Sequence, residues 1–261
     1  TTFGYPEVIG GEFVESRRGN KKIQVLYDQK PDPNAELYVL GNAPQLVNRS
    51  KNLVEKITSL RKKIPFHKLI YTPGIAQPQN MALLSYLGVD FFDSSFAEYF
   101  SQKDVELTDW MGFPDDSSNN NRRLMNELKI IRKAIVKNKI RELIESRTRS
   151  EPWMVEVLRF MDKRYSLVSD TVPVTADKIL VTTSEGLNRP DIERFRRRIR
   201  KGYRPPDREL LLLLPFSASK PYFQSKSHSY FRNALKDTNW TKIHEVMLTS
   251  PLGAVPREIE Q

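Results

Sequence analysis

The chain has 261 residues, a formal net charge of +10 and no cysteine. Without cysteine it can form no disulfide, thiolate zinc site or iron–sulfur cluster, and it has no cysteine nucleophile. We expect no membrane span, because no apolar run approaches about eighteen residues. The first residues lack a secretory signal pattern, which predicts a cytoplasmic protein. The positive charge fits a polyanionic partner, RNA or DNA above all, and fits solvated surface charge equally well.

The first part of the chain alternates strand and helix patterns. Ser50 is expected to cap the first helix, and Pro78 to take the first position of the second. This alternation is typical of parallel α/β structure, but its three units are too few to close an eight-stranded barrel. The predicted strands cover residues 23–27, 37–40, 69–71 and 89–92, and the predicted helices cover residues 50–63 and 78–87.

A polar run at residues 115–121 marks the expected domain boundary. It separates a β/α domain, residues 1–115, from a second part, residues 116–261. We divide that part into a helical lead-in, residues 116–170, and an α/β domain, residues 171–261. The lead-in contains a long broken helix to about Arg147 and a helix from Pro152. In the last domain we predict strands at 178–182, 210–214 and 243–248, and helices at 189–201 and 227–236.

Five consecutive leucines, residues 210–214, predict a strand that is buried on both faces. A loop rich in hydroxyl groups and lysines follows at 215–228. A helix then leads to the strand at 243–248 and a polar turn. Because parallel strands place their carboxyl ends on one edge of a sheet, the 215–228 and 249–258 loops should face one crevice.

His228 is the candidate general base of this crevice. It lies in the first turn of a helix capped by Ser225, where the helix dipole favours neutral imidazole, which can accept a proton. The alternative is that Ser225 is only a cap and His228 only a surface residue. The loop has neither a phosphate-binding glycine pattern nor a nucleophile elbow. His67 and His244 are not spaced as metal ligands, so we expect no metal.

The segment from Arg194 to Arg204 predicts a basic helix and tail. We interpret it as a contact for the phosphate backbone of RNA, against the alternative of a solvated helix surface. The expected RNA-binding residues are Arg196, Arg197, Arg200 and Lys226.

The pattern Pro215-Phe216-x3-Lys220-Pro221-Tyr222-x2-Ser225-x2-His228 resembles the archaeosine synthase motif, Pro-Cys-x3-Lys-Pro-Tyr-x2-Ser-x2-His. That family is the archaeal paralogue of tRNA-guanine transglycosylase. Residues 145–153, 184–199 and 245–260 also resemble it, and residues 71–95 resemble the last strands of the transglycosylase barrel. The resemblance covers most of residues 36–261 and departs from the motif at Phe216, which stands where the family has cysteine.

The resemblance implies a fold and an activity. The fold is α/β: a partial transglycosylase-like β/α barrel segment, then a three-layer α/β sandwich similar to uracil-DNA glycosylase. The activity is addition of free lysine to the nitrile of 7-cyano-7-deazaguanine in the tRNA D-loop, with no cofactor. A radical S-adenosylmethionine enzyme then acts as the partner that completes archaeosine. The tRNA-binding PUA domain and the first half of the barrel are not represented, so either the chain is a fragment or they are separate subunits.

The resemblance also suggests roles for individual residues. His228 is the expected base for the lysine amine, with Lys220, Ser225 and Tyr222 orienting the reactants. We interpret Asp93, which matches the transglycosylase nucleophile, as a vestigial barrel residue. The expected substrate-binding residues are Ser217, Ser219, Ser250, Arg257 and Glu258, the last two for the carboxylate and α-amine of lysine.

Two further functions remain open at this stage. In the first, Phe216 marks a degenerate site, and the chain is a non-catalytic tRNA-binding or scaffold subunit of an archaeosine-forming complex. In the second, which ranks last, Asp93 performs base excision or exchange.

Overall fold

The computed structural model describes residues 22–47, 49–115, 119–164, 166, 179–218 and 220–260. The chain forms two compact units, Thr1–Leu180 and Val181–Gln261. The division near residue 180 means that the expected boundary near residue 115 falls inside the first unit. No helix in the described part of the chain is long and apolar enough to cross a membrane.

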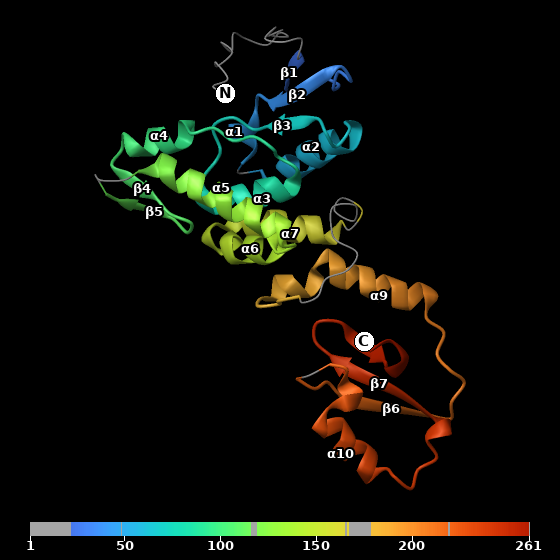
Figure 1. The fold of residues 1–261 in the computed structure, drawn as a ribbon. Helices are drawn as coiled ribbons and strands as arrows, with labels where there is room; N and C mark the ends of the chain where they lie inside the picture. Colours follow the sequence, from blue (N-terminus) through green and yellow to red (C-terminus); the bar gives the residue numbers. More distant parts are fainter. Residues whose placement is uncertain are drawn as a thin grey trace. The chain divides into compact units, whose positions relative to one another are not determined.

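The first unit contains a parallel sheet in the order β1-β2-β3. The strands are β1 (Lys22–Leu26), β2 (Ala35–Leu40) and β3 (Leu69–Tyr71). The strand expected at residues 89–92 is reduced to one bridge between Tyr71 and Phe91. The architecture is therefore mixed α/β, and the described strands close no barrel (Figure 1).

The described helices of the first unit fall in two groups: the first two lie between β2 and β3, and the others come after β3. They are α1 (Ala43–Leu46), α2 (Ser50–Lys63), α3 (Pro78–Leu87), α4 (Ser95–Ser101), α5 (Asn120–Val136), α6 (Ile140–Arg147) and α7 (Pro152–Lys163), with a short antiparallel hairpin of β4 (Val105–Leu107) and β5 (Gly112–Pro114) between α4 and α5.

Helix α3 lies at the centre of this unit. Most of its residues are buried, and it contacts α2, α5, α6 and α7. Pro78 is its first residue, as predicted, and Gly88 ends it with a φ of 107°, a left-handed conformation that glycine adopts without strain. The expected cap of α2 is wrong in detail: Ser50 is the first helical residue, and its hydroxyl donates to the Trp153 carbonyl at 3.3 Å.

The helices after residue 119 bury their apolar faces on the same core as the sheet. Leu124 and Ile131 of α5, Ile144 of α6 and Leu158 of α7 belong to one cluster with Leu40 of β2. A boundary near residue 115 would expose these side chains, which explains why the first unit continues to Leu180.

The second unit is a three-stranded sheet in the order β6-β7-β8. It consists of β6 (Leu210–Pro215), β7 (Ile243–Thr249), β8 (Gly253–Pro256) and the helices α9 (Pro190–Gly202) and α10 (Lys226–Ala234), with 3-10 turns at Ser184–Asn188, Tyr222–Gln224, Trp240–Lys242 and Arg257–Ile259. Strands β6 and β7 are parallel, as predicted, whereas β8 is antiparallel and was not predicted.

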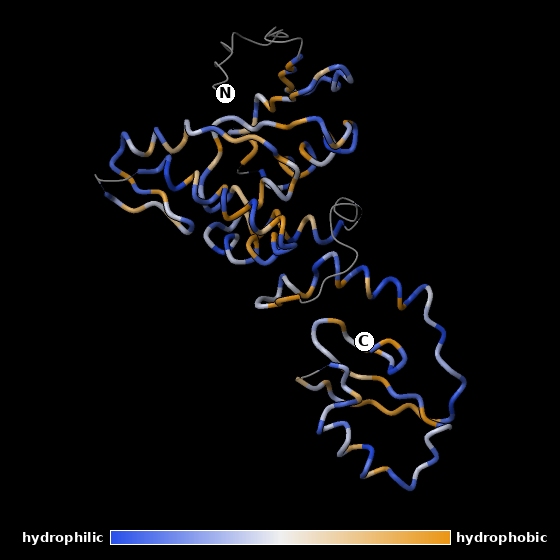
Figure 2. The backbone as a smooth tube through the Cα atoms, in the orientation of Figure 1, coloured by the Kyte–Doolittle hydropathy of each residue, from blue (hydrophilic) through white to orange (hydrophobic). Residues whose placement is uncertain are grey.

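Two predictions for this unit are wrong. Residues 179–182 form no strand, and Lys178 lies outside the described residues. The leucine strand is not buried on both faces: Leu211 and Leu213 are 62% and 52% exposed, and only Leu214 is buried. Hydrophobicity alone (orange in Figure 2) predicted burial, whereas the described elements leave most of these leucine side chains uncovered.

A buried charge network links the helices of the first unit. Arg141 of α6 donates two hydrogen bonds of 2.6 Å to Asp162 of α7 and one of 2.8 Å to Glu145. All three side chains are almost fully buried. The network raises the pKa of Arg141, against the effect of its burial, and so holds the guanidinium charged.

Replacement of Arg141 by methionine is therefore expected to destabilise the first unit by about 3–5 kcal/mol, because two buried carboxylates lose their partner. Urea denaturation measures the change, and Lys62→Met on exposed α2 surface is the control. An unchanged unfolding midpoint for Arg141→Met would show that the charge network does not stabilise the first unit.

Candidate functional site

The parallel strands β6 and β7 bring two polar loops together at their carboxyl ends. Tyr222, after β6, is buried, and its hydroxyl lies 3.2 Å from Oγ1 of Thr249, the last residue of β7. Tyr222 also packs with Met247 and Val255 in the small apolar core of the unit. The two loops therefore meet through a buried hydroxyl pair.

Helix α10 begins as the sequence predicts. Ser225 is its N-cap, and its hydroxyl accepts a 3.3 Å hydrogen bond from the His228 amide. A second hydroxyl, that of Ser227, lies 3.2 Å from the Ser225 hydroxyl. The cap fixes the first turn of the helix and therefore the direction in which the His228 side chain points.

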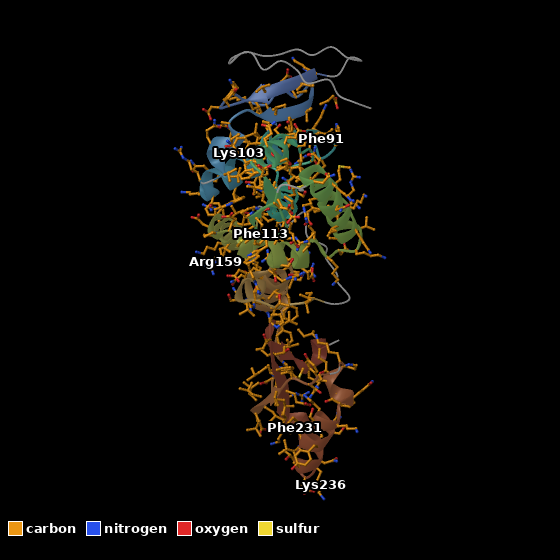
Figure 3. The ribbon with its side chains drawn as sticks, turned by 90° about the vertical axis from the view of Figure 1, so that its left-hand side faces the viewer. Phe91, Lys103, Phe113, Arg159, Phe231 and Lys236 are labelled. Carbon is orange, nitrogen blue, oxygen red and sulfur yellow. The ribbon has the colours of Figure 1, made fainter. Side chains whose placement is uncertain are left out.

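His228 is fully buried rather than a surface residue. Its Nε2 lies 2.9 Å from the Pro215 carbonyl, and its Nδ1 lies 3.0 Å from a guanidinium nitrogen of Arg257. Because a carbonyl only accepts and a guanidinium only donates, the ring is neutral with its proton on Nε2. Tyr222 stacks on one side at 5.9 Å, and Phe231 (Figure 3) meets the ring edge-on at 5.7 Å.

Arg257 joins three parts of the unit. Besides His228, it donates to Glu245 of β7 at 2.5 and 3.0 Å and to Glu260 at 2.7 Å. Glu260 in turn accepts the Phe223 amide at 3.1 Å. These contacts already occupy the Nε and both terminal nitrogens of the guanidinium, which was expected to bind the carboxylate of lysine.

None of the other predicted site residues that the structure describes has a hydrogen bond to His228 or Arg257. Lys220 is exposed, with its ammonium 5.6 Å from the Tyr222 ring centre. Ser217 is half-buried, whereas Ser250 and Lys226 are exposed. Ser219 lies outside the described residues.

Glu258 is exposed and belongs to a hydrogen-bonded group with Tyr203 and His244. It accepts the Tyr203 hydroxyl at 3.1 Å, and that hydroxyl also lies 2.9 Å from Nε2 of His244. Burial, with the hydrogen bond to Glu258, raises the pKa of Tyr203 to about 12. Tyr203 therefore remains a neutral hydroxyl at physiological pH.

The arginines of α9 divide between internal and solvent contacts. Arg196 donates to the carbonyls of Pro251 and Leu252 at 2.7 and 3.4 Å, so it fastens the turn after β7. Arg197 pairs with Glu193 at 2.7 Å. Arg200 is exposed and lies 4.0 Å from the same carboxylate.

Phe216, which stands where the resembling motif was expected to have cysteine, is 55% exposed. Its amide donates to the Leu248 carbonyl at 3.2 Å, which extends the pairing of β6 with β7 by one residue. The backbone at this position therefore belongs to the sheet, and the aromatic ring is open to solvent.

Asp93 lies in the first unit, at the carboxyl edge of its sheet. Its Oδ2 accepts hydrogen bonds from the Tyr71 hydroxyl at 2.8 Å and from the Gly74 amide at 2.7 Å. The Ser95 amide donates to Oδ1 at 2.7 Å. Burial opposes ionisation, but these hydrogen bonds outweigh it, so the pKa of Asp93 lies below its ordinary value. The side chain is a fixed carboxylate.

Sequence reasoning missed the acidic partners of Arg257, Glu245 and Glu260. Glu245 lies on β7 two residues before Met247, and therefore on the same face of the strand as that core residue. A charged residue in phase with a core residue signals a buried ion pair, and this was the available clue. Glu260 follows the last strand and carried no such pattern.

Comparisons with known proteins show what the chain is similar to. A family model described as "Domain of unknown function (DUF5591)" matches residues 192–261. The "Archaeosine synthase subunit alpha" of Methanosarcina acetivorans is 35% identical over 87% of this chain and 41% of its own length. That of Thermoplasma acidophilum is 36% identical over 98% of this chain and 53% of its own. The chain thus spans about half the length of these relatives.

A wider relationship is visible as well. The "tRNA-guanine(15) transglycosylase" of Methanobrevibacter smithii is 24% identical over 97% of this chain and 43% of its own length. The chain is therefore related to the transglycosylases. Its similarity to the archaeosine synthases is higher, at 35% and 36% identity, which confirms the resemblance seen in the sequence.

Replacing Arg257 with methionine is expected to loosen the second unit. Two carboxylates and His228 lose a donor, which costs about 2 kcal/mol for charge-assisted hydrogen bonds. Amide hydrogen exchange over β7 and β8 should accelerate. Arg204→Met, an exposed site without a side-chain partner in the described part of the chain, is the control. Exchange as slow as in the wild type would show that Arg257 does not hold these strands.

Replacing Asp93 with asparagine tests the fixed carboxylate. The amide group would face backbone donors, so we expect a loss of about 1–3 kcal/mol at pH 7. Because the pKa of Asp93 is lower in the folded state, the ionised carboxylate stabilises the fold at pH values above the pKa of the unfolded chain, about 4. This stabilisation is lost as the pH falls through the lower pKa of the folded state. The difference between wild type and variant, measured by urea unfolding, should therefore narrow as the pH falls below about 4. A constant difference would contradict an ionised Asp93.

Proposed function

We propose that the chain acts in archaeosine formation, by adding free lysine to the nitrile of 7-cyano-7-deazaguanine in the D-loop of tRNA. The observation that carries the proposal is the contact between the two loops: Tyr222 of the motif meets Thr249, and His228, whose helix Ser225 caps, meets Arg257. The relationship to archaeosine synthases along most of this chain supports it.

The proposal includes the finer folds of the two units. We assign the first unit to a partial transglycosylase-like β/α barrel segment, supported by its three parallel strands and by Asp93 at their carboxyl edge. We assign the second to a three-layer sandwich resembling uracil-DNA glycosylase, supported by the parallel β6-α10-β7 unit with the motif at its edge.

The chemistry is an addition that forms one bond. The nitrogen of the neutral lysine side-chain amine attacks the nitrile carbon, and one π bond of the nitrile becomes a lone pair on nitrogen. A proton leaves the attacking nitrogen, and one reaches the former nitrile nitrogen, which yields the amidine. The reaction needs a proton acceptor, a proton donor and a site that holds the lysine, but no oxidant or ATP.

Within this scheme His228 is the centre of the site. Its Nδ1 lone pair is held by Arg257, so His228 accepts a proton only when that contact opens; while it is closed, the ring positions the guanidinium. Lys220 and the hydroxyls of Tyr222 and Ser225 orient the reactants. Glu258, exposed at the second loop, is the proposed partner of the lysine α-amine.

The proposed partners follow from the same reaction. They are tRNA and free lysine as substrates, and a radical S-adenosylmethionine enzyme that removes the lysine part of the adduct. The names of the relatives include "subunit alpha". On that basis we propose a complex with at least one further subunit, and we place the reaction in the cytoplasm, where tRNA is modified.

A non-catalytic tRNA-binding subunit is the second candidate. It is favoured by two observations: Phe216 replaces the motif cysteine, and both ring nitrogens of His228 are already engaged. Mass spectrometry of cyano-deazaguanine tRNA incubated with free lysine discriminates between the candidates. A gain of one lysine supports the enzyme, and salt-sensitive tRNA binding without that gain supports the subunit.

His228→Ala is expected to abolish lysine incorporation, because the proposed proton acceptor is removed and Arg257 loses its contact with Nδ1. Binding of tRNA should persist. His67→Ala, at an exposed histidine of the first unit, is the matched control. His228→Gln can still accept from Arg257, so activity retained in that variant would assign a positioning role. Full activity in His228→Ala would exclude His228 from the reaction.

A further inference from the structure

Helix α5 (green in Figure 1) carries a stripe of positive charge along its exposed side. Its buried side is formed by Leu124, Glu127 and Ile131. On the opposite side, residues spaced by four, three, four and four positions lie on one face, the spacing that a helix of 3.6 residues per turn requires. They form what we call the basic ridge: Arg122, Asn126, Lys129, Lys133 and Lys137, all exposed.

The charges of the basic ridge are not used within the fold. None of its four cations pairs with an acidic side chain in the described part of the chain. The one acidic residue of α5, Glu127, is buried and receives two 3.1 Å hydrogen bonds from Arg147. Lys129 and Lys133 are one helical turn apart, and like charges at that spacing destabilise a helix. The ridge therefore costs stability until an anion neutralises it.

Helix α9, the basic helix expected from the sequence to contact RNA, differs in this respect. Arg189, at its N-cap, pairs with Asp191 at 3.0 Å. Arg196 holds backbone carbonyls, and Arg197 pairs with Glu193. Much of its charge is thus committed internally, whereas the charge of the ridge is available to a partner.

We propose that the basic ridge of α5 is a docking surface for the phosphate backbone of RNA. The inference rests on the proposed function for the kind of RNA, namely tRNA. Neighbouring ridge cations one turn apart are about 6 Å apart along the helix axis, so the row follows a line rather than surrounding a single anion. A line of cations without an ion pair in the described part of the chain suits a continuous polyanion, which lysine binds as a point charge without base selectivity.

The test measures binding of unfractionated tRNA to the full 261-residue chain by fluorescence anisotropy. The salt series runs from about 50 to about 200 mM KCl. The double variant Lys129→Glu/Lys133→Glu is expected to weaken binding at least about tenfold. It should also reduce the slope of log affinity against log salt by about 1.4–1.8, since each lost phosphate contact removes about 0.7–0.9.

The matched control is Lys62→Glu/Lys63→Glu on α2, which makes the same charge change at two exposed lysines of the same unit. It should leave the salt slope unchanged. Lys129→Gln/Lys133→Gln provides a milder second pair, and circular dichroism checks the fold of each variant.

Three outcomes would overturn the inference: no binding of tRNA by the wild type at low salt, equal weakening by both reversal pairs, or wild-type affinity in the ridge variants. Preferential binding of the ridge to vesicles of anionic lipid would overturn it as well. The outcome is separable from the proposed function, because lysine incorporation can fail while ridge-dependent tRNA binding remains, and the reverse.

Discussion

The second unit depends on one guanidinium. Its apolar core contains few buried side chains, so packing alone cannot fix the positions of the loops at its sheet edge. Arg257 supplies what packing does not: it links Glu245 on β7, His228 on α10 and Glu260 after the last strand. Charge-assisted hydrogen bonds are directional, so they fix the positions of these three side chains relative to one another.

The cations of this chain have two different tasks. Some arginines stabilise the interior: Arg141 bridges two helices, and Arg196 donates to the carbonyls of a turn. The planar guanidinium suits such sites, because it can satisfy several acceptors at once. Lysines of the basic ridge face solvent without a partner in the described part of the chain. The net charge of +10 already counts every acidic side chain against the cations, so it does not show on which surface the unpaired cations lie.

Local signals predicted local structure well. Helix α3 begins at Pro78 and stops at Gly88 as expected, and the parallel pairing of β6 with β7 follows from their order in the chain. Non-local properties were harder, because they depend on what packs against an element. The helices after residue 119 share a core with the sheet, which no boundary signal in the polar run reveals. The same holds for the site: the cap at Ser225 was predictable, and the carboxylates around Arg257 were not.

The leucine strand has a consequence for the protein in solution. In the described residues β6 pairs on one side only, with β7, and most of its leucines are uncovered. An edge with unpaired backbone donors and acceptors, flanked by apolar side chains, can pair with an extended segment of another chain, which adds a strand to the sheet. We therefore expect copies of the second unit to associate through β6 at high concentration. Repulsion between the positively charged copies opposes this association.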